Sequence, residues 1–245
     1  MTNGADKRFQ SRSLSAPDWH DTDLSEAVFV DCLIQDVDAS GTDLTGARFK
    51  GCRIVRSRFA RCDLREAVFE DCGFADPETR TGLTTAFSTL DQARFVNCDL
   101  TLSLFDRSSL YAIEMRDCNL RGARLASADF AKAFGRKVIR SAATFHDCNL
   151  ELADLSGARL AECVLSDCDL READLSNADL TGADLTRSNL FHAILTGAKL
   201  AGADLRGAEV SGLDLAVLTT REGLKVTANQ QYALLTALGL DVSAD

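Results

Sequence analysis

The chain has 245 residues, of which 46% are hydrophobic and only two are proline, a composition that indicates one folded domain and argues against disorder. Its formal net charge of −10 disfavours nucleic acid as a direct partner, because contacts to phosphates need clustered cations. The sequence has no apolar stretch of about 18 residues and no apolar run of signal-peptide length near its start, so we expect a cytoplasmic protein with no membrane partner.

Residues 1–20 are mostly polar and show no regular spacing of apolar residues. We expect them to form a flexible N-terminal tail, with Trp19 covering the start of the folded part. The regular part of the chain is expected to span residues 21–218.

A large apolar residue occupies every fifth position over most of this part. The spacing runs in one unbroken phase from Leu150 to Leu215, and in earlier phases from Leu24 to Phe74 and from Leu90 to Phe130. A small residue usually stands two positions earlier, as in Ala173-Asp174-Leu175. Neither the helical period of about 3.6 nor the strand period of 2 produces this spacing. A fixed repeat this short indicates a solenoid.

The five-residue spacing predicts a square coil. If the small residue and the large residue of each unit both point inward, the chain between them is extended, because alternate side chains share a face. The chain must then turn a corner before the next pair. Four corners close a coil of about twenty residues, and about nine such coils stacked at ~4.8 Å would give a rod of roughly 45 Å.

The periodicity slips by one residue after Phe74, because Leu90 follows at a distance of sixteen positions rather than fifteen. The intervening segment 75–83 contains Pro77 and Gly82 among other turn-forming residues. We expect this segment to be a loop that protrudes from the coil.

A second interruption lies between Phe130 and Phe145. The phase holds there, but Gly135 and Arg140 occupy positions that elsewhere hold large apolar residues. Segment 131–141 is therefore predicted to leave the coil as a second protruding loop. The alternative interpretation is a degenerate coil in which the Arg140 side chain extends outward to solvent.

All nine cysteines fall in the small position, two residues before a large apolar residue. We expect them to be buried and reduced, since free cysteine often behaves as a small apolar residue. The sequence contains no CxxC pair and no matching pair of histidines. It therefore predicts no disulfide framework, no metal site and no other cofactor.

Residues 219–245 follow a different pattern from the repeats. Thr227 and Gln230 have the spacing of a capping box, residues 228–238 predict a helix, and Gly239 stands where a helix commonly ends. Such a helix would cover the open end of a solenoid, where strand edges and core are otherwise exposed.

The same helix carries an apolar face made by Leu234, Leu235 and Leu238. We expect this face to form the interface of a two-fold homodimer, which would double the length of the rod.

The repeating unit, seen for example as Ala173-Asp174-Leu175-Ser176-Asn177, resembles the A(D/N)LXX unit of the pentapeptide repeat proteins. The resemblance covers about residues 22–217 and implies an all-β fold, a right-handed quadrilateral parallel β-helix. Finer features are similar to the Qnr-type quinolone-resistance proteins of that family. These features are two loops that interrupt the coil, segment 108–118 between them, and the ending Gly223-Leu224-Lys225-Val226 followed by a helix. The chain departs from that group in an extra N-terminal coil and in a more basic second loop.

This resemblance implies a protein that binds type II topoisomerases, DNA gyrase first and topoisomerase IV as a second partner, and protects them from fluoroquinolones. The rod would mimic DNA while the loops contact the enzyme. Carried over by position, the candidates in the first loop are Asp76, Glu78, Arg80 and Gly82. The candidates in the second loop are Phe134, Arg136, Lys137, Val138 and Ile139.

Two other functions remain as alternatives. The first is a repeat scaffold for another cytoplasmic partner, in which the acidic residues serve solubility. The second is an enzyme, and the residues argue against it. His20 falls in the expected tail, His146 and His192 fall at outward corner positions, and every cysteine falls at an inward position.

Overall fold

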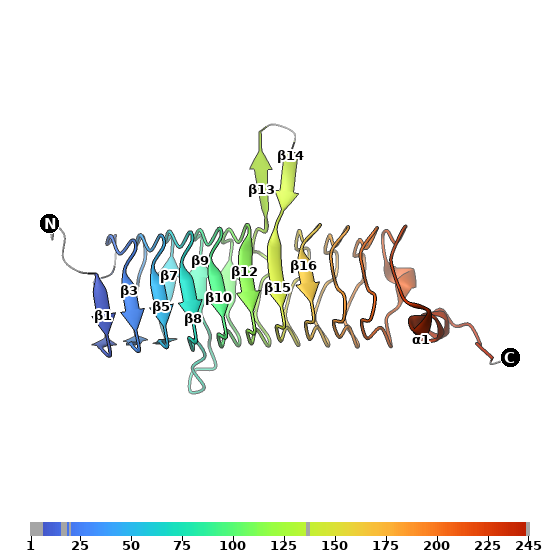
Figure 1. Ribbon diagram of the computed structural model, residues 1–245, viewed down its shortest axis with the longest axis horizontal. Helices are drawn as coiled ribbons and strands as arrows, with labels where there is room; N and C mark the ends of the chain where they lie inside the picture. Colours follow the sequence, from blue (N-terminus) through green and yellow to red (C-terminus); the bar gives the residue numbers. More distant parts are fainter. Residues whose placement is uncertain (1–6, 16–18, 20, 136–137, 244–245) are drawn as a thin grey trace.

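The computed structural model describes residues 7–15, 19, 21–135 and 138–243 of the chain. The chain winds into a right-handed quadrilateral parallel β-helix, an elongated rod in which successive coils stack along one axis (Figure 1). This confirms the predicted fold class. Two protrusions leave the rod on opposite sides, and a short helix covers its C-terminal end (Figure 1).

Three parallel sheets form sides of the rod, with partners about twenty residues apart in most pairs. The longest sheet contains β1 (Arg8–Gln10), β3 (Val28–Val30), β5 (Arg48–Lys50), β8 (Val68–Glu70), β10 (Arg94–Val96), β12 (Ile113–Arg116), β15 (Ala143–His146) and β16 (Val164–Ser166). The second contains β2 (Ser13–Leu14), β4 (Leu33–Gln35) and β6 (Arg53–Val55). The third contains β7 (Arg58–Ala60), β9 (Thr84–Ala86) and β11 (Leu104–Asp106).

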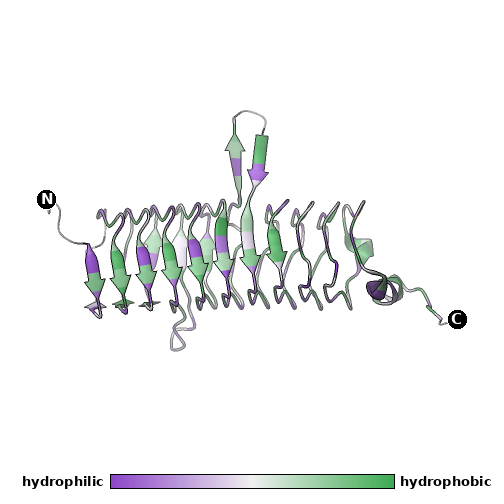
Figure 2. Cartoon of the chain, viewed as in Figure 1, coloured by the Kyte–Doolittle hydropathy of each residue, from purple (hydrophilic) through white to green (hydrophobic). Residues whose placement is uncertain are grey.

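The core consists of columns in which large apolar side chains of successive coils stack. The rings of Phe29 and Phe49 lie 4.6 Å apart, and those of Phe49 and Phe69 lie 4.7 Å apart, both nearly parallel. These distances match the spacing of paired strands, so residues in register on neighbouring coils meet face to face. Residues of the strands that point away from the columns are mostly hydrophilic, so hydrophilic and hydrophobic residues alternate along the strands (Figure 2).

The corners explain why aspartate recurs just before the large residue. The Asp43 carboxylate accepts a hydrogen bond from the Thr45 amide at 2.9 Å, which holds the turn closed. Two residues after the large position the chain adopts a left-handed conformation, with φ of 52° at Asp31 and 61° at Gly51. Gly51 also meets a close approach, because an added Cβ would lie 2.5 Å from Asp31 Oδ1.

All nine cysteines are buried and free, as the sequence predicted. Their thiols point along the inner wall and approach backbone carbonyls, for example Cys52 Sγ at 3.5 Å from the Phe29 oxygen. Burial raises the pKa of the Cys62 thiol to about 11 and that of Cys163 to about 12. Both remain protonated near neutral pH and are therefore poor nucleophiles.

The N-terminal segment differs from the expected flexible tail. Strands β1 and β2 pair in parallel with β3 and β4, so residues 8–14 add a coil to the rod. Phe9 stacks on Phe29 at 4.8 Å, and the buried Trp19 ring lies 5.5 Å from the same ring. The spacing of five between Phe9 and Leu14 was hidden because Lys7 and Arg12 stand where small residues usually precede them. An end coil has an open side, so these long side chains reach solvent.

At the other end, coil pairing continues past residue 218, to Thr220 and Lys225. The 3₁₀ turns η1 (Leu215–Val217) and η2 (Ala228–Gln230) flank this last coil, and helix α1 (Gln231–Ala237) follows. The helix is shorter than the predicted 228–238, because its first turn is 3₁₀. Within the described part of the chain, no helix combines the length and the apolar character that a membrane span needs.

Candidate partner-binding surfaces

The first protrusion is a tight loop organised by Asp76. The backbone of Asp76 bridges to Thr81 across the loop, and its side chain is buried. Its carboxylate accepts hydrogen bonds from the Glu78 amide and the Thr79 hydroxyl, both at 3.1 Å. A third bond comes from the Arg56 guanidinium at 3.3 Å. Desolvation alone would raise the pKa of Asp76, but these three donors together lower it below the ordinary value of 3.8.

The four first-loop candidates thus fall into two groups. Asp76 and Gly82 are buried, and a Cβ added to Gly82 would lie 2.2 Å from the Thr101 carbonyl oxygen. These two residues shape the loop, and we correct the expectation that they face a partner. Glu78 and Arg80 are exposed and remain candidates for contact.

A hollow of about 370 Å³ lies beneath this loop, lined by residues that include Pro77, Arg80 and Leu102. It coincides with a gap in an outward column of side chains, because Gly73 stands between Arg53 and Asp99 on successive coils. A Cβ added to Gly73 would meet no atom within 4 Å. The loop therefore overhangs open space rather than resting on the coil.

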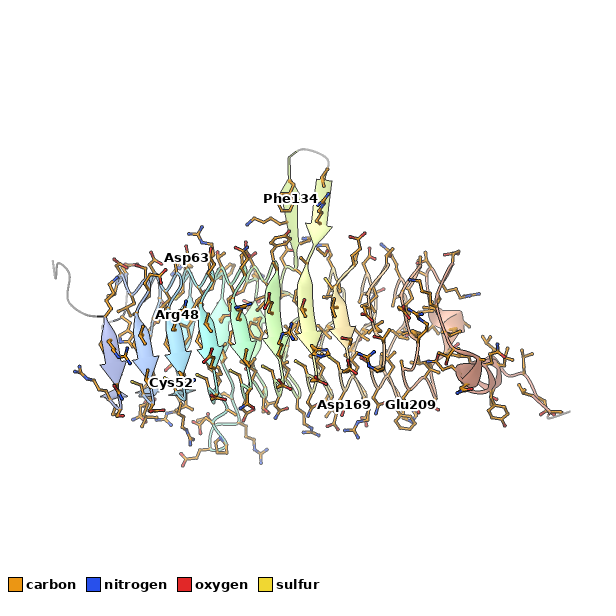
Figure 3. The ribbon with its side chains drawn as sticks, viewed as in Figure 1. Arg48, Cys52, Asp63, Phe134, Asp169 and Glu209 are labelled. Carbon is orange, nitrogen blue, oxygen red and sulfur yellow. The ribbon has the colours of Figure 1, made fainter. Side chains whose placement is uncertain are left out.

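The second protrusion is a β-hairpin rather than an irregular loop. Strands β13 (Ala131–Phe134) and β14 (Val138–Ser141) pair antiparallel, and Arg140 lies opposite Lys132 outside the coil. The alternative of a degenerate coil is therefore wrong. Figure 3 shows Phe134 near the end of this hairpin, well away from the rod. The candidates Arg136 and Lys137 lie outside the described residues.

The hairpin exposes apolar side chains. Phe134 is 48% exposed, Val138 45% and Ile139 64%. Val138 pairs directly opposite Phe134, so these two side chains share one face of the hairpin, whereas Ile139 pairs with Ala133 and points to the other face. Exposed apolar side chains on both faces of one small protrusion are of the kind that marks a protein interaction site. Among the candidates from the sequence, the structure therefore brings Phe134 and Val138 together and places Ile139 on the opposite face.

The base of the hairpin contacts two residues, Asp91 and Tyr111, that the sequence did not link to it. Lys132 Nζ lies 2.8 Å from Asp91 Oδ2, across 41 positions of the chain. The same ammonium group lies 5.6 Å from the centroid of the Tyr111 ring, and this ring meets Phe134 edge-on at 5.7 Å. No local pattern links Asp91 or Tyr111 to segment 131–141, so sequence inspection had no signal for them.

The three residues predicted for the dimer interface differ in burial. Leu234 is only 7% exposed and packs onto the last coil, so it does not face a second copy as expected. Gln230 completes this cap, because its amide nitrogen donates to the carbonyl oxygens of Leu205 at 2.6 Å and Ala208 at 2.8 Å. Leu235 and Leu238 are exposed, and so is Tyr232, which the sequence did not single out.

The rod surface is acidic, but much of this charge is neutralised internally. Residues 149–214 contain twelve Asp or Glu and five Lys or Arg, a net charge of −7. Figure 3 shows Asp169 and Glu209 along one edge of this half. Asp169 pairs with Arg171 at 2.6 Å, and Asp204 pairs with Arg206 at 2.7 Å.

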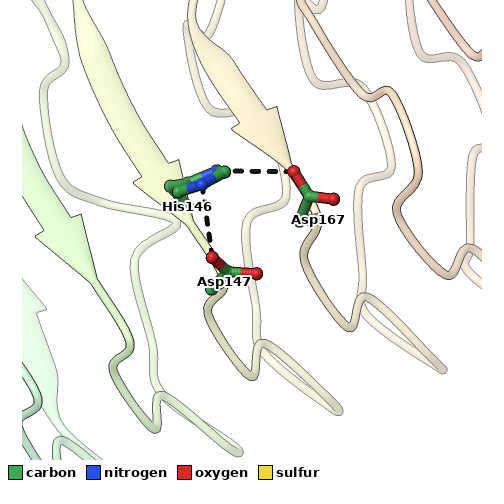
Figure 4. A group of neighbouring side chains, drawn as sticks. All are labelled: His146, Asp147 and Asp167. Atoms are coloured by element: carbon green, nitrogen blue, oxygen red, sulfur yellow. Dashed lines mark ion pairs between the residues drawn. The ribbon is translucent and has the colours of Figure 1, made fainter.

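His146, Asp147 and Asp167 form the one group among the described residues whose ligand atoms lie close enough for a metal ion (Figure 4). The geometry does not fit one. The Asp147 carboxylate lies 3.2 Å from His146 Nε2, and the Asp167 carboxylate lies 3.5 Å from Nδ1. The two carboxylates therefore lie beside different ring nitrogens and do not share one nitrogen with a common metal position. Asp167 is further engaged by Arg187 Nε at 2.6 Å. The group is an ion-pair network between neighbouring coils.

Such pairs make the stability of the rod depend on pH. Hydrogen bonds from Arg56, Arg65 and Arg206 lower the pKa values of Asp36, Asp63 and Asp204 from their ordinary value of 3.8. A carboxyl with a lowered pKa in the folded state stabilises that state above pH 3.8, and the contribution is lost as the pH falls further. We therefore expect the melting temperature to be steady from pH 7 to about 5 and to fall below about pH 4. Melting followed by circular dichroism checks this, and a constant melting temperature down to pH 2.5 would contradict it.

Comparison with known proteins places these surfaces in context. A family model described as "Pentapeptide repeats" matches in eight copies, over residues 20–51, 42–74, 86–122, 113–157, 148–187 and 183–216. The quinolone resistance pentapeptide repeat protein QnrB96 of Scandinavium goeteborgense is 31% identical over 123 residues, which make up 48% of this chain and 58% of that protein. The match thus spans little more than half of this curated relative.

Solved structures of QnrB1, described as a plasmid-mediated fluoroquinolone resistance protein, share the fold. The full-length structure matches 95% of this chain and 100% of its own, with a TM-score of 0.66 at 23% identity. A trypsin-treated variant matches 89% of this chain and 100% of its own, with a TM-score of 0.67 at 26% identity.

Proposed function

We propose that this chain, which belongs to the pentapeptide repeat family, binds a type II topoisomerase and protects it from fluoroquinolones. DNA gyrase is the first partner and topoisomerase IV the second. The observation that carries this proposal is the hairpin, which presents Phe134, Val138 and Ile139 on one small protrusion outside the coil. The similarity to two quinolone resistance proteins supports the choice of partner.

The rod itself supplies shape more than charge. A rod of roughly 50 Å compares with B-DNA that would carry about 30 negative charges over that length, against a net charge of −10 here. That net charge already includes the basic partners of pairs such as Asp169 with Arg171, so the negative field of the rod is much weaker than that of DNA. A rod that mimics DNA can therefore fit the enzyme's DNA-binding surface, but specific affinity has to come from the protrusions.

The two protrusions would contact the topoisomerase at separate places, because they leave the rod on opposite sides (Figure 1). The hairpin provides apolar anchors of the type that dominate protein interfaces. The first loop provides the exposed charges of Glu78 and Arg80, on a backbone held by Asp76. Nine free thiols agree with the reducing cytoplasm, where a topoisomerase would be met.

A gyrase supercoiling assay with ciprofloxacin tests the proposal. Adding the wild-type protein is expected to restore supercoiling at drug concentrations that otherwise stop it. The absence of rescue at any protein concentration would reject the proposal. It would favour the second candidate function, a scaffold for another cytoplasmic partner, to which internal neutralisation of the acidic surface also points.

We also propose that α1 joins two copies end to end. Tyr232, Leu235 and Leu238 expose apolar surface at the end of the rod, where a two-fold contact would pair α1 with itself. We expect Leu235→Glu with Leu238→Glu to convert a dimer into a monomer, because the charges would be buried unpaired. Light scattering after gel filtration measures this. Leu152→Glu, at another exposed leucine on the rod, serves as the control. A monomeric wild type, or a double variant that stays dimeric, would contradict the proposal.

A further inference from the structure

The hairpin needs an anchor beyond its own hydrogen bonds. Its strands have four residues each, and isolated two-stranded hairpins are marginally stable in water. Within the described residues, Lys132, Ala133 and Phe134 are exposed, as are Val138 and Ile139. Only Ala131, at the base of β13, is buried. Without further contacts the hairpin would swing about its base.

The column of side chains directly before the hairpin supplies these contacts. Thr89, Ser109 and Asp129 pair on successive coils, and two positions later the same coils carry Asp91, Tyr111 and Ala131. Strand β13 therefore starts where this column reaches the third coil. From there Lys132 extends back over the Tyr111 ring to Asp91, two coils away.

Asp91 divides its two carboxylate oxygens between the coil and the hairpin. Oδ1 accepts hydrogen bonds from the Ser109 hydroxyl and, at 3.3 Å, from the Tyr111 amide. Asp129 accepts a hydrogen bond from the amide two positions later in its own coil and so closes its own corner. On the preceding coil the equivalent residue is Ser109, which has no carboxylate, so Asp91 accepts the bond from the Tyr111 amide instead. Oδ2 accepts from Lys132 at 2.8 Å.

The pair differs from ordinary surface ion pairs in its burial. The Asp91 side chain is 7% exposed, whereas both partners in pairs such as Lys199–Asp179 are at least a third exposed. A buried carboxylate has lost most of its hydration, so its attraction for Lys132 is screened less than on the surface. Removing that charge is accordingly expected to matter more here than at exposed pairs such as Lys199–Asp179.

We infer that Asp91, Lys132 and Tyr111 form a clamp that holds the hairpin at one angle to the rod, which makes Asp91 a positioning residue for partner binding. The first half concerns the free protein alone. The second half rests on the proposed function, since a hairpin already fixed in direction pays less conformational entropy when it meets the topoisomerase.

Hydrogen–deuterium exchange of the free protein tests the clamp. Asp91→Asn keeps an oxygen that can accept from Ser109 and Tyr111 but removes the charge that Lys132 meets. We expect amides of residues 132–134 and 138–140 to exchange about tenfold faster, as suits the loss of a charge-assisted hydrogen bond. Asp179→Asn, which breaks the exposed pair with Lys199, is the matched control and should leave hairpin exchange unchanged.

Lys132→Met provides a second test, because the Asp91 substitution can also disturb the coil through the Ser109 and Tyr111 hydrogen bonds. The substitution at Lys132 keeps an unbranched side chain of similar length without the charge, and the site is half-exposed and outside the coil. Both variants should accelerate exchange in the hairpin and not in the neighbouring strands β10 and β12. Hairpin exchange within about twofold of wild type in Lys132→Met would overturn the clamp.

The supercoiling assay separates the two halves of the inference. If wild type rescues gyrase, both variants should need about tenfold more protein for the same rescue, the equivalent of about 1.4 kcal/mol. Faster exchange with unchanged rescue would overturn the positioning role and leave the clamp. A wild type without rescue would reject the proposed function, and with it the positioning role, while the exchange result still decides the clamp.

Discussion

Replacing residues 132–140 by an Asn-Gly turn is expected to weaken protection of DNA gyrase strongly while the rod stays folded. The replacement removes Phe134, Val138 and Ile139, the exposed apolar residues proposed to anchor the partner. Ala131 and Ser141 already pair at the base of the hairpin, so a two-residue turn can close the chain there. We expect the protein concentration that gives half-maximal rescue to rise at least about thirtyfold, which corresponds to the loss of one hot spot of about 2 kcal/mol.

Point substitutions separate the apolar surface from the hairpin backbone. Val138→Ser with Ile139→Ser should reproduce most of the loss of rescue, because it removes two of the apolar side chains. The strands and the Lys132 contact remain, so the effect can be assigned to those side chains. Phe191→Ser removes another exposed apolar side chain, 41% exposed on the rod, and should leave rescue unchanged. Unaltered melting by circular dichroism must accompany each result. Full rescue by the turn variant would show that the hairpin is not the active element.

Phe69→Ala is expected to cost about 3–5 kcal/mol of unfolding free energy, the range for a large aromatic residue truncated in a packed core. The Phe69 ring is buried and stacks between those of Phe49 at 4.7 Å and Phe95 at 4.6 Å. The cavity would interrupt the column at β8, between β5 and β10. Since each coil contacts its neighbours only, it would also weaken the coupling between the parts of the rod on either side. Urea unfolding measures the loss.

The end of the same column provides the control. Phe9 stacks on Phe29 alone and is partly exposed, so Phe9→Ala should cost no more than about half as much as Phe69→Ala. Equal losses at the two positions would contradict the columnar account of stability. A broadened urea transition in Phe69→Ala would indicate that the parts of the rod on either side of this residue unfold separately.

The repeat could be predicted because its cause is local. Each inward pair recurs within five residues, and the corner needs only an aspartate one position earlier or a left-handed residue two positions later, as at Asp43 and Gly51. The same locality located the phase slip after Phe74 and the misfit of Gly135 and Arg140. It failed at Phe9, where an end coil relaxes the demand for small neighbours.

Residue roles within the protrusions could not be predicted in the same way. Asp76 looked like any charged loop residue, yet it is buried because Arg56, twenty positions earlier, and two donors of its own loop surround it. Leu234 and Leu235 are adjacent in the same apolar face, and packing on the last coil buries the first and exposes the second. Such differences depend on what lies opposite each side chain in space.

Local spacing was enough to predict the square coil, the buried free thiols and the two places where the chain leaves the rod, because all of these follow from side chains within five or so residues of one another. The hairpin at the second interruption, and the contact of Lys132 with Asp91 across 41 positions, became visible in the folded chain alone. Coils stack residues about twenty positions apart at the distance of paired strands. Contacts between coils are therefore governed by the spacing of the stack and not by neighbours in the chain.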